Sequence, residues 1–178
     1  MGDGSYGPAI RLDQDAGQFS LVADFNGDGI PDLAGIDGGS AFSPVTIRLG
    51  KGDGTFGPPR VFETDDVYRG LVAGDIDGDG RIDLIATGGS SIEVLLGNGD
   101  GTFRRGTTIA AGQTLRSAAK LIDLNGDGKL DLEFDSTESD NLTVRGAVYL
   151  GNGDGTFQPP VDLSEDVTTL IQDAQFAD

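Results

Sequence analysis

The chain has no cysteine, no histidine and no tryptophan, and it has only 12 Lys and Arg against 30 Asp and Glu among its 178 residues. Without cysteine, disulfides and thiolate metal sites are excluded. Without histidine, the commonest transition-metal ligand and the usual general base are missing, which argues against zinc, copper and haem. The formal net charge of −18 repels nucleic acids and anionic membranes, so we expect no nucleic-acid partner.

Long hydrophobic runs are also absent. No stretch approaches the roughly 18 apolar residues of a membrane-spanning helix, so we expect no membrane insertion. The first ten residues, MGDGSYGPAI, lack the basic and apolar regions of a signal peptide. Acidic chains are often disordered, but 37% of these residues are hydrophobic and they alternate in short runs, which favours a folded protein.

A nine-residue acidic loop occurs three times, as DFNGDGIPD, DIDGDGRID and DLNGDGKLD. Each copy has Asp or Asn at positions 1, 3, 5 and 9 and glycine at positions 4 and 6. Oxygen ligands at alternate positions of a tight turn are how a short loop surrounds a hard cation such as Ca²⁺. The candidate side-chain ligands are Asp24, Asn26, Asp28, Asp32, Asp75, Asp77, Asp79, Asp83, Asp123, Asn125, Asp127 and Asp131.

Two other interpretations of these loops fit the sequence less well. An EF-hand requires a glutamate at position 12 and flanking helices. Position 12 is Gly35, Ala86 and Phe134 in the three copies, and the flanking residues are typical of strands. Plain Asx turns do not readily account for four spaced oxygens that recur three times despite their mutual repulsion. The sequence therefore predicts about three Ca²⁺ per chain.

A second motif follows each loop, as GDGTFGPP, GDGTFRRG and GDGTFQPP, and a related GDGSYGP stands at the N-terminus. Gly-Asp-Gly between apolar runs is typical of a hairpin. Asp53, Asp100 and Asp154 of these turns are interpreted as turn residues, and the following Phe residues as packing between repeats. Arg104 and Arg105 form the only basic pair, which we interpret as a solvated edge.

Short β-branched runs between these motifs give four strands in about 50 residues, which is the pattern of a propeller blade. We therefore predict an all-β chain of β-propeller blades, with three complete four-stranded blades and partial terminal strands. The expected divisions are an outer strand of a preceding blade, three blades, and the inner strand of a further blade, at residues 1–13, 14–64, 65–113, 114–165 and 166–178.

The DxNGDGxxDL loop followed by LGNGDGTFxPP resembles the FG-GAP or VCBS-type repeat of integrin-α-like β-propellers, over essentially the whole chain. The resemblance implies that each loop joins the innermost strand of a blade to the next strand and binds Ca²⁺. It adds the position-7 carbonyl groups of Ile30, Arg81 and Lys129 to the ligand set. Such propellers close with about seven blades, whereas this chain has three.

No catalytic pattern is found, since there is no histidine, cysteine or G-x-S-x-G motif. Five loop groups approach the 6–8 ligands of a Ca²⁺ site, which favours a structural role for the ion. We expect a non-catalytic scaffold for binding or adhesion, outside the cell or on its surface, with a protein or glycan ligand. The alternatives are part of the propeller of an extracellular carbohydrate-active enzyme, a lyase or a hydrolase, and a partial propeller that assembles as a homo-oligomer. Three blades are too few to close a ring, so we expect a dimer that exchanges terminal strands.

Overall fold

The computed structural model describes residues 18–36, 42–89, 91–110, 114–115, 119–137 and 144–162. All regular structure in these ranges is β-strand, so the expected all-β class is confirmed. None of the described residues forms a helix long and apolar enough to cross a membrane. The strands expected at residues 1–13 and 166–178 lie outside the described ranges.

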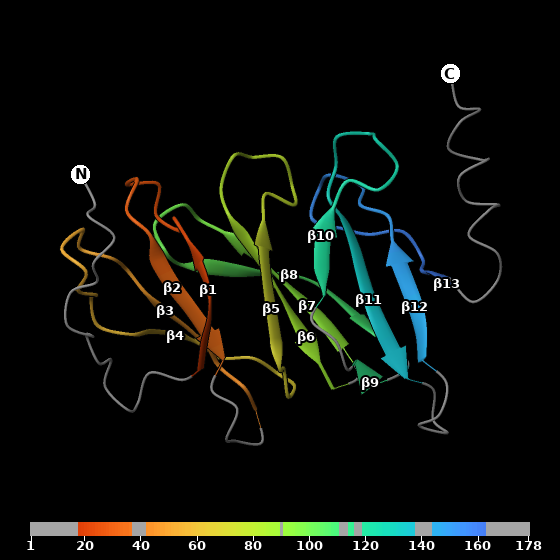
Figure 1. Cartoon of the computed structure of the whole chain (residues 1–178), viewed down its shortest axis with the longest axis horizontal. Coiled ribbons are helices and arrows are strands. Elements are labelled where there is room, and N and C mark those ends of the chain that lie inside the picture. The colour runs from red at the N-terminus through yellow and green to blue at the C-terminus, as the bar shows by residue number, and fades with distance from the viewer. Residues whose placement is uncertain are drawn as a thin grey trace, which may run out of the picture.

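The strands form three antiparallel sheets, and in each sheet the strand order follows the chain (Figure 1). The first sheet contains β1 (Gln18–Ala23), β2 (Asp32–Ile36), β3 (Val45–Arg48) and β4 (Arg60–Phe62). The second contains β5 (Gly70–Gly74), β6 (Asp83–Gly88), β7 (Ser91–Gly97) and β8 (Phe103–Ala110). The third contains β10 (Lys120–Ile122), β11 (Asp131–Thr137), β12 (Val144–Tyr149) and β13 (Val161–Asp162), and β9 (Thr114–Leu115) also pairs with β11. We call the three sheets blade 1, blade 2 and blade 3.

The three blades lie side by side in Figure 1, and the first strand of blade 2, β5, contacts both β1 and β10. Two hydrophobic cores fill the spaces between neighbouring blades. The first includes Ile47 of blade 1 and Leu84 of blade 2, and the second includes Ile85 of blade 2 and Leu132 of blade 3. Because neighbouring residues of a strand point to opposite faces, blade 2 contributes to both cores. Each fully buried aliphatic side chain stabilises the fold by about 1.5–3 kcal/mol relative to its exposed state.

The outer strands differ in length because of proline. In blades 1 and 3 the turn is followed by Pro58-Pro59 or Pro159-Pro160, and the outer strands β4 and β13 begin only after these residues. Proline cannot donate a ladder hydrogen bond. Blade 2 has no proline at this place, so β8 pairs with β7 directly from Phe103, which lies opposite Gly97. This difference gives blade 2 an eight-residue outer strand.

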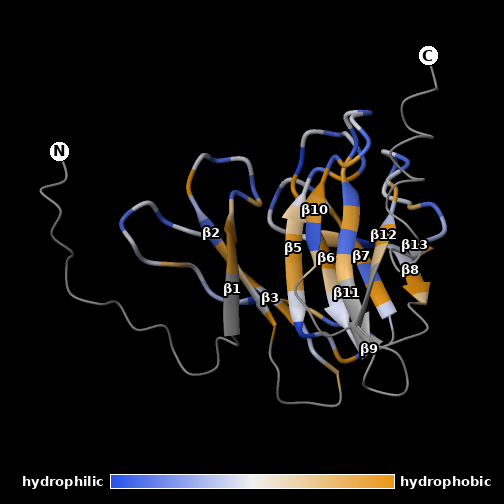
Figure 2. Ribbon diagram, turned by 45° about the vertical axis from the view of Figure 1, so that its right-hand side comes forward, coloured by the Kyte–Doolittle hydropathy of each residue, from blue (hydrophilic) through white to orange (hydrophobic). Residues whose placement is uncertain are grey.

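The acidic loops connect the first and second strands of every blade, at residues 24–32, 75–83 and 123–131, and we call them loops 1, 2 and 3. All three lie at the same end of the blades, at the top of Figure 1. In Figure 2 that end is coloured mainly as hydrophilic, in contrast to the strands beneath it. The fold thus collects the three loops on one side of the protein.

Candidate metal loops

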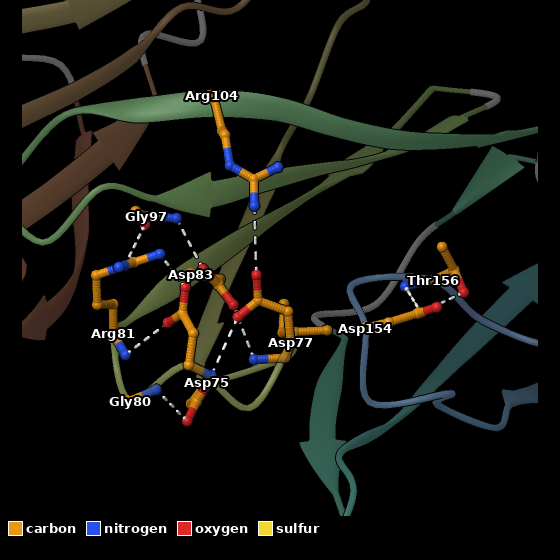
Figure 3. A network of polar contacts seen from close by, with 11 residues as sticks. Asp75, Asp77, Gly80, Arg81, Asp83, Gly97, Arg104, Asp154 and Thr156 are labelled. Atoms are coloured by element: carbon orange, nitrogen blue, oxygen red, sulfur yellow. Dashed lines mark hydrogen bonds and ion pairs between the residues drawn. The ribbon is translucent and has the colours of Figure 1, made fainter.

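Each loop folds around the carboxylate at position 1, which accepts hydrogen bonds from the backbone of the loop itself. In loop 1, Asp24 Oδ1 accepts from Gly27 N at 2.8 Å and Asp24 Oδ2 accepts from Gly29 N at 2.8 Å. Asp123 of loop 3 has the same two contacts, with Gly126 N at 2.7 Å and Gly128 N at 2.9 Å. In loop 2, Asp75 accepts from Asp79 N and Gly80 N, at 3.0 and 2.9 Å (Figure 3).

Glycine is required at positions 4 and 6 by the backbone conformation. All six of these glycines have φ between 72° and 82°, which is the left-handed region that side chains disfavour. This conformation turns the amide groups inward, toward the position-1 carboxylate. The N–H of Gly29 is the largest reason why the pKa of Asp24 is lowered, because a hydrogen bond from the backbone stabilises the charged form.

Positions 3 and 5 complete the inner ring of oxygens. The position-5 carboxylates of Asp28, Asp79 and Asp127 accept from the N–H two residues further on, at 2.8, 2.9 and 2.9 Å. In loop 3 this N–H belongs to Lys129, and it is the largest reason for the lowered pKa of Asp127. The position-3 side chains of Asn26, Asp77 and Asn125 each accept a hydrogen bond from the N–H of position 5, at 3.0, 3.3 and 3.0 Å.

The position-9 aspartates have a role that was not predicted from the sequence. Asp32, Asp83 and Asp131 are completely buried, and both oxygens of each are hydrogen-bonded. Asp83 Oδ2 accepts from Ile76 N at 2.8 Å, and Oδ1 accepts from Gly97 N at 2.7 Å. The acceptors in the other blades are arranged in the same way, with distances of 2.7–2.9 Å. Position 9 therefore ties the loop to the end of the third strand in every blade.

The glycine that donates the hydrogen bond to position 9 could have been recognised in the sequence, because the Gly-Asp-Gly turns are all preceded by such a glycine, at Gly50, Gly97 and Gly151. A Cβ on any of them would lie 2.2–2.3 Å from a backbone carbonyl oxygen of the residue at loop position 8. Burial raises the pKa of Asp83, and the hydrogen bonds from Gly97 and Ile76 oppose this shift. Because glycine has no side chain, the Gly97 N–H can come close enough to donate to Asp83, and this hydrogen bond offsets part of the cost of burying the carboxylate.

Loop 2 is the most acidic of the three. Carboxylate oxygens of Asp75, Asp77 and Asp83 all lie within 4.8 Å of one another, which makes this a group that can hold a metal ion. Two arginines offset the charge: Arg81 pairs with Asp79, and Arg104 of β8 reaches Asp77 Oδ2 at 3.4 Å (Figure 3). Blades 1 and 3 have asparagine at position 3, and they have glycine or glutamine in place of Arg104. Blade 2 thus has both the additional carboxylate, Asp77, and the additional arginine that pairs with it, Arg104.

These groups fit a hard cation. Each loop has Asp or Asn, with side-chain oxygen atoms as candidate ligands, at positions 1, 3, 5 and 9. In loop 2, the predicted ligands Asp75, Asp77 and Asp83 form the group that can hold an ion. The other side chains, Asp79 and those of loops 1 and 3, remain predicted ligands. The position-7 carbonyl groups of Ile30, Arg81 and Lys129 remain predicted ligands, assigned from the resemblance. A bound divalent ion would supply the charge that these converging carboxylates lack.

The Gly-Asp-Gly turns are structural, as expected from the sequence. Asp53, Asp100 and Asp154 each accept two hydrogen bonds from the threonine two residues later, one from its amide and one from its hydroxyl. The threonine hydroxyl is the largest cause of the lowered pKa in all three aspartates. These hydrogen bonds are internal to the turn, so the three carboxylates serve the turn rather than the acidic loops.

A polar cluster between blades 1 and 2 was not anticipated. Arg105 donates to Glu93 Oε1 at 2.9 Å and to the Glu63 carbonyl at 2.7 Å, and it also pairs with Asp65. Its guanidinium lies 5.5 Å from the Phe62 ring centroid. Arg105 therefore fastens the segment between β4 and β5, and the interpretation of the basic pair as a solvated edge was incomplete.

Glu93 and Tyr68 in this cluster are nearly inaccessible to solvent, at 2% and 1% exposure. Burial raises the pKa of Glu93, opposed by the positive charge of Arg105, and burial raises the pKa of Tyr68 to about 12. Glu93 is thus a buried carboxylate that already has a cationic partner, Arg105.

FG-GAP-like repeats match the chain at residues 24–86 and 75–132. The chain belongs to the FG-GAP-like repeat family. Both matched segments start at the first aspartate of a loop, and together they span all three loops. No curated protein matches the chain.

Two of the solved structures that match this FG-GAP-like protein are a lectin and a biofilm matrix protein. One is the structure of an Agrocybe aegerita lectin, described as the structural basis of its specific recognition of non-reducing terminal N-acetylglucosamine. It is 30% identical with a TM-score of 0.57, over 82% of this chain and 38% of the lectin chain. The other is the V. cholerae biofilm matrix protein Bap1, 19% identical with a TM-score of 0.38, over 79% of this chain and 27% of that chain. The FG-GAP-like chain thus spans well under half of either protein.

Proposed function

We propose that this FG-GAP-like chain is a calcium-stabilised, non-catalytic scaffold that binds a glycan or a protein outside the cell. The observation that carries the proposal is the repetition of one polar geometry in three loops, each with oxygen donors only. Ca²⁺ suits such sites because it accepts 6–8 oxygen ligands in flexible geometry. Extracellular fluid, where Ca²⁺ is abundant, is the environment in which such loops would be filled.

The ion has a structural role in this proposal. Each loop joins the first two strands of its blade, and the position-9 aspartate joins the loop to the third strand. An ion held between these groups would therefore connect three of the four strands of a blade. It would also relieve the repulsion among ten aspartates in the three loops.

Glycan binding is supported by the similarity to the lectin, which covers 82% of this chain. A non-catalytic role is supported by the state of the carboxylates. Those in the loops are hydrogen-bonded to the backbone, and Glu93, outside the loops, is buried and paired with Arg105. A carboxylate that acts as a general acid or base must reach the substrate.

The test is a glycan array probed with the fluorescently labelled chain, in Ca²⁺ and in EDTA. We expect Ca²⁺-dependent binding to a restricted set of glycans, with those ending in N-acetylglucosamine as the first probe. Asp79→Ala should weaken binding through loss of loop 2, and Asp53→Ala, which alters only a turn, is the matched control. Equal binding to all glycans, or release of reducing sugar from them, would contradict the proposal.

A further inference from the structure

The two ends of the row of blades expose complementary faces. Every blade has a leading face, toward the preceding blade, and a trailing face, toward the following one. In blade 2 the leading face includes Leu84 and Leu95 in the first core, and the trailing face includes Ile76 and Ile85 in the second. Among the described residues, no blade covers the leading face of blade 1 or the trailing face of blade 3.

Exposed apolar side chains concentrate on these two end faces. Five large hydrophobic residues in the described ranges are exposed: Val22, Phe42, Val61, Ile122 and Leu124, at 64%, 54%, 56%, 49% and 49%. Val22 corresponds to Ala73 and Leu121, which pack toward the preceding blade. Val61 pairs with Thr46 in the ladder and shares its leading face.

Ile122 and Leu124 lie on the trailing face of blade 3, on either side of Asp123. Leu124 corresponds to Phe25 and Ile76, each only 2% exposed because the next blade covers it. Ile122 corresponds to Gly74, where an added Cβ would lie 2.6 Å from Leu130 and 3.3 Å from Leu121 of the next blade. At the internal interfaces these positions are therefore in close contact with a following blade, whereas at blade 3 they face solvent.

The internal interfaces also show which groups should meet at the end faces. Phe103 of blade 2 contacts Phe25 of blade 1 edge to face, with ring centroids 5.8 Å apart. The neighbouring Gly101 N–H donates to the Phe25 carbonyl at 3.0 Å. In blade 1 the corresponding residues are Phe56 and Gly54. By equivalence, Phe56 and Gly54 fit against a residue in the place of Phe25, which in blade 3 is Leu124.

Charged residues replace apolar ones at one position on each of the same two faces. Ala34 and Leu95 belong to the first core, and their equivalents Ile85 and Tyr149 belong to the second. The corresponding residues at the end faces are Glu133 on the trailing face and Arg48 on the leading face. Two positions that are apolar or aromatic at the internal interfaces are thus occupied by an acidic residue in blade 3 and a basic residue in blade 1.

Of these two charged residues, Glu133 has capacity for a new contact, whereas Arg48 is only 8% exposed. Arg48 is buried, its guanidinium donates to the Gly57 carbonyl at 3.3 Å, and its Nε has no hydrogen-bond partner in the structure. Glu133 accepts from Lys120 Nζ at 2.9 Å through one oxygen. A carboxylate has room for further donors. The two faces therefore match in their exposed apolar side chains, and Glu133 adds a hydrogen-bond acceptor on the trailing face.

We propose that the trailing face of blade 3 binds the leading face of blade 1 of a second copy of this chain. Two copies joined head to tail at both ends would form a ring of six blades, within the range in which propellers close. In each of the two contacts, Leu124 packs against the partner's Phe56, and Ile122 packs against the partner's Val22. The contact uses the faces of blades 1 and 3 and goes beyond metal or glycan binding.

Reciprocal charge substitution tests the proposal. Sedimentation velocity at micromolar concentration should give the mass of two copies for the unmodified chain. Ile122→Lys alone and Val22→Asp alone should each give monomers, with the dissociation constant raised at least about 100-fold, because each variant places an unpaired charge in both contacts. Both residues are exposed, so the variants should keep the circular dichroism of the parent chain.

Mixing the two variants is the decisive step. A mixed pair has one unmodified contact and one contact in which the introduced lysine would meet the introduced aspartate, so the dimer should return. Phe42→Asp, at an exposed apolar residue between β2 and β3, is the matched control and should leave dimerisation unchanged. A monomeric parent chain, a mixture that stays monomeric, or equal loss of dimer with Phe42→Asp would overturn the proposal.

Discussion

Replacing Asp83 with alanine should destabilise the chain even when no metal is present. Asp83 is fully buried, and its two oxygens accept hydrogen bonds from the N–H groups of Ile76 and Gly97, at 2.8 and 2.7 Å. Alanine removes both acceptors and leaves two buried donors without partners. This loss of stability does not depend on a bound ion. Measuring it without metal therefore separates the contribution of Asp83 to the stability of the fold from its contribution to metal binding.

The expected loss follows from those two donors. An unsatisfied buried hydrogen-bonding group costs about 1–3 kcal/mol, so the two together lower the free energy of unfolding by about 2–6 kcal/mol. Burial raises the pKa of Asp83, and removing that buried charge offsets a part of the loss. We therefore expect the net effect in the lower half of this range, about 2–4 kcal/mol.

The assay is urea unfolding in EDTA, followed by circular dichroism. Asp79→Ala is the matched control in the same loop, because Asp79 is exposed and water can replace its contacts. In EDTA we expect Asp79→Ala to change the free energy of unfolding by less than about 1 kcal/mol. If Asp83→Ala and the parent chain unfold at the same urea concentration in EDTA, the proposed tie between loop and third strand is refuted.

Three further predictions concern the turns and the polar cluster. Gly97→Ala places a Cβ 2.2 Å from the Ile82 carbonyl oxygen. We therefore expect the free energy of unfolding, measured in urea, to fall by about 1–3 kcal/mol or more. A urea midpoint equal to that of the parent would contradict this, because it would show that the backbone at residue 97 can move away from Ile82. Asp154 has a lowered pKa, so its contribution exists above its unfolded pKa of 3.8 and disappears as the pH falls through the folded value. Asp154→Asn should therefore melt at a lower temperature than the parent at neutral pH but not in acid, and a pH-independent difference would contradict this cause. Glu93 has a raised pKa, so its burial is tolerated below the unfolded value and becomes costly as the pH rises through the folded one. Removing its cation by Arg105→Ala should thus cost about 1–3 kcal/mol near pH 8 and less near pH 4, and equal losses at both pH values would exclude the charge pair as the reason.

The sequence was sufficient for the fold class and for the residues of the loops, because both depend on local patterns that recur. The alternation of Leu84 and Ile85 between two cores follows from the strand period, and the positive φ at Gly78 and Gly80 follows from the loop pattern. Three copies of these patterns removed the ambiguity that a single copy would leave.

What could not be predicted depends on contacts between distant parts of the chain. The hydrogen bond from Gly97 to Asp83 spans 14 residues, and the contact of Arg105 with Asp65 spans 40. No sequence period indicates such pairs. The composition of the GDGTFRRG turn did contain a signal for a longer outer strand, since it lacks the two prolines of the other turns. The partner of Arg105 required the structure.

Calcium binding by the three loops is the central claim, and its direct test is isothermal titration of Ca²⁺ into the metal-free chain. We predict about three ions per chain, one for each loop. Asp24→Ala, Asp75→Ala and Asp123→Ala should each remove one ion, and Asp53→Ala should remove none, because Asp53 accepts its hydrogen bonds within its own turn. Uptake of no Ca²⁺, or of one ion per chain, would contradict the account.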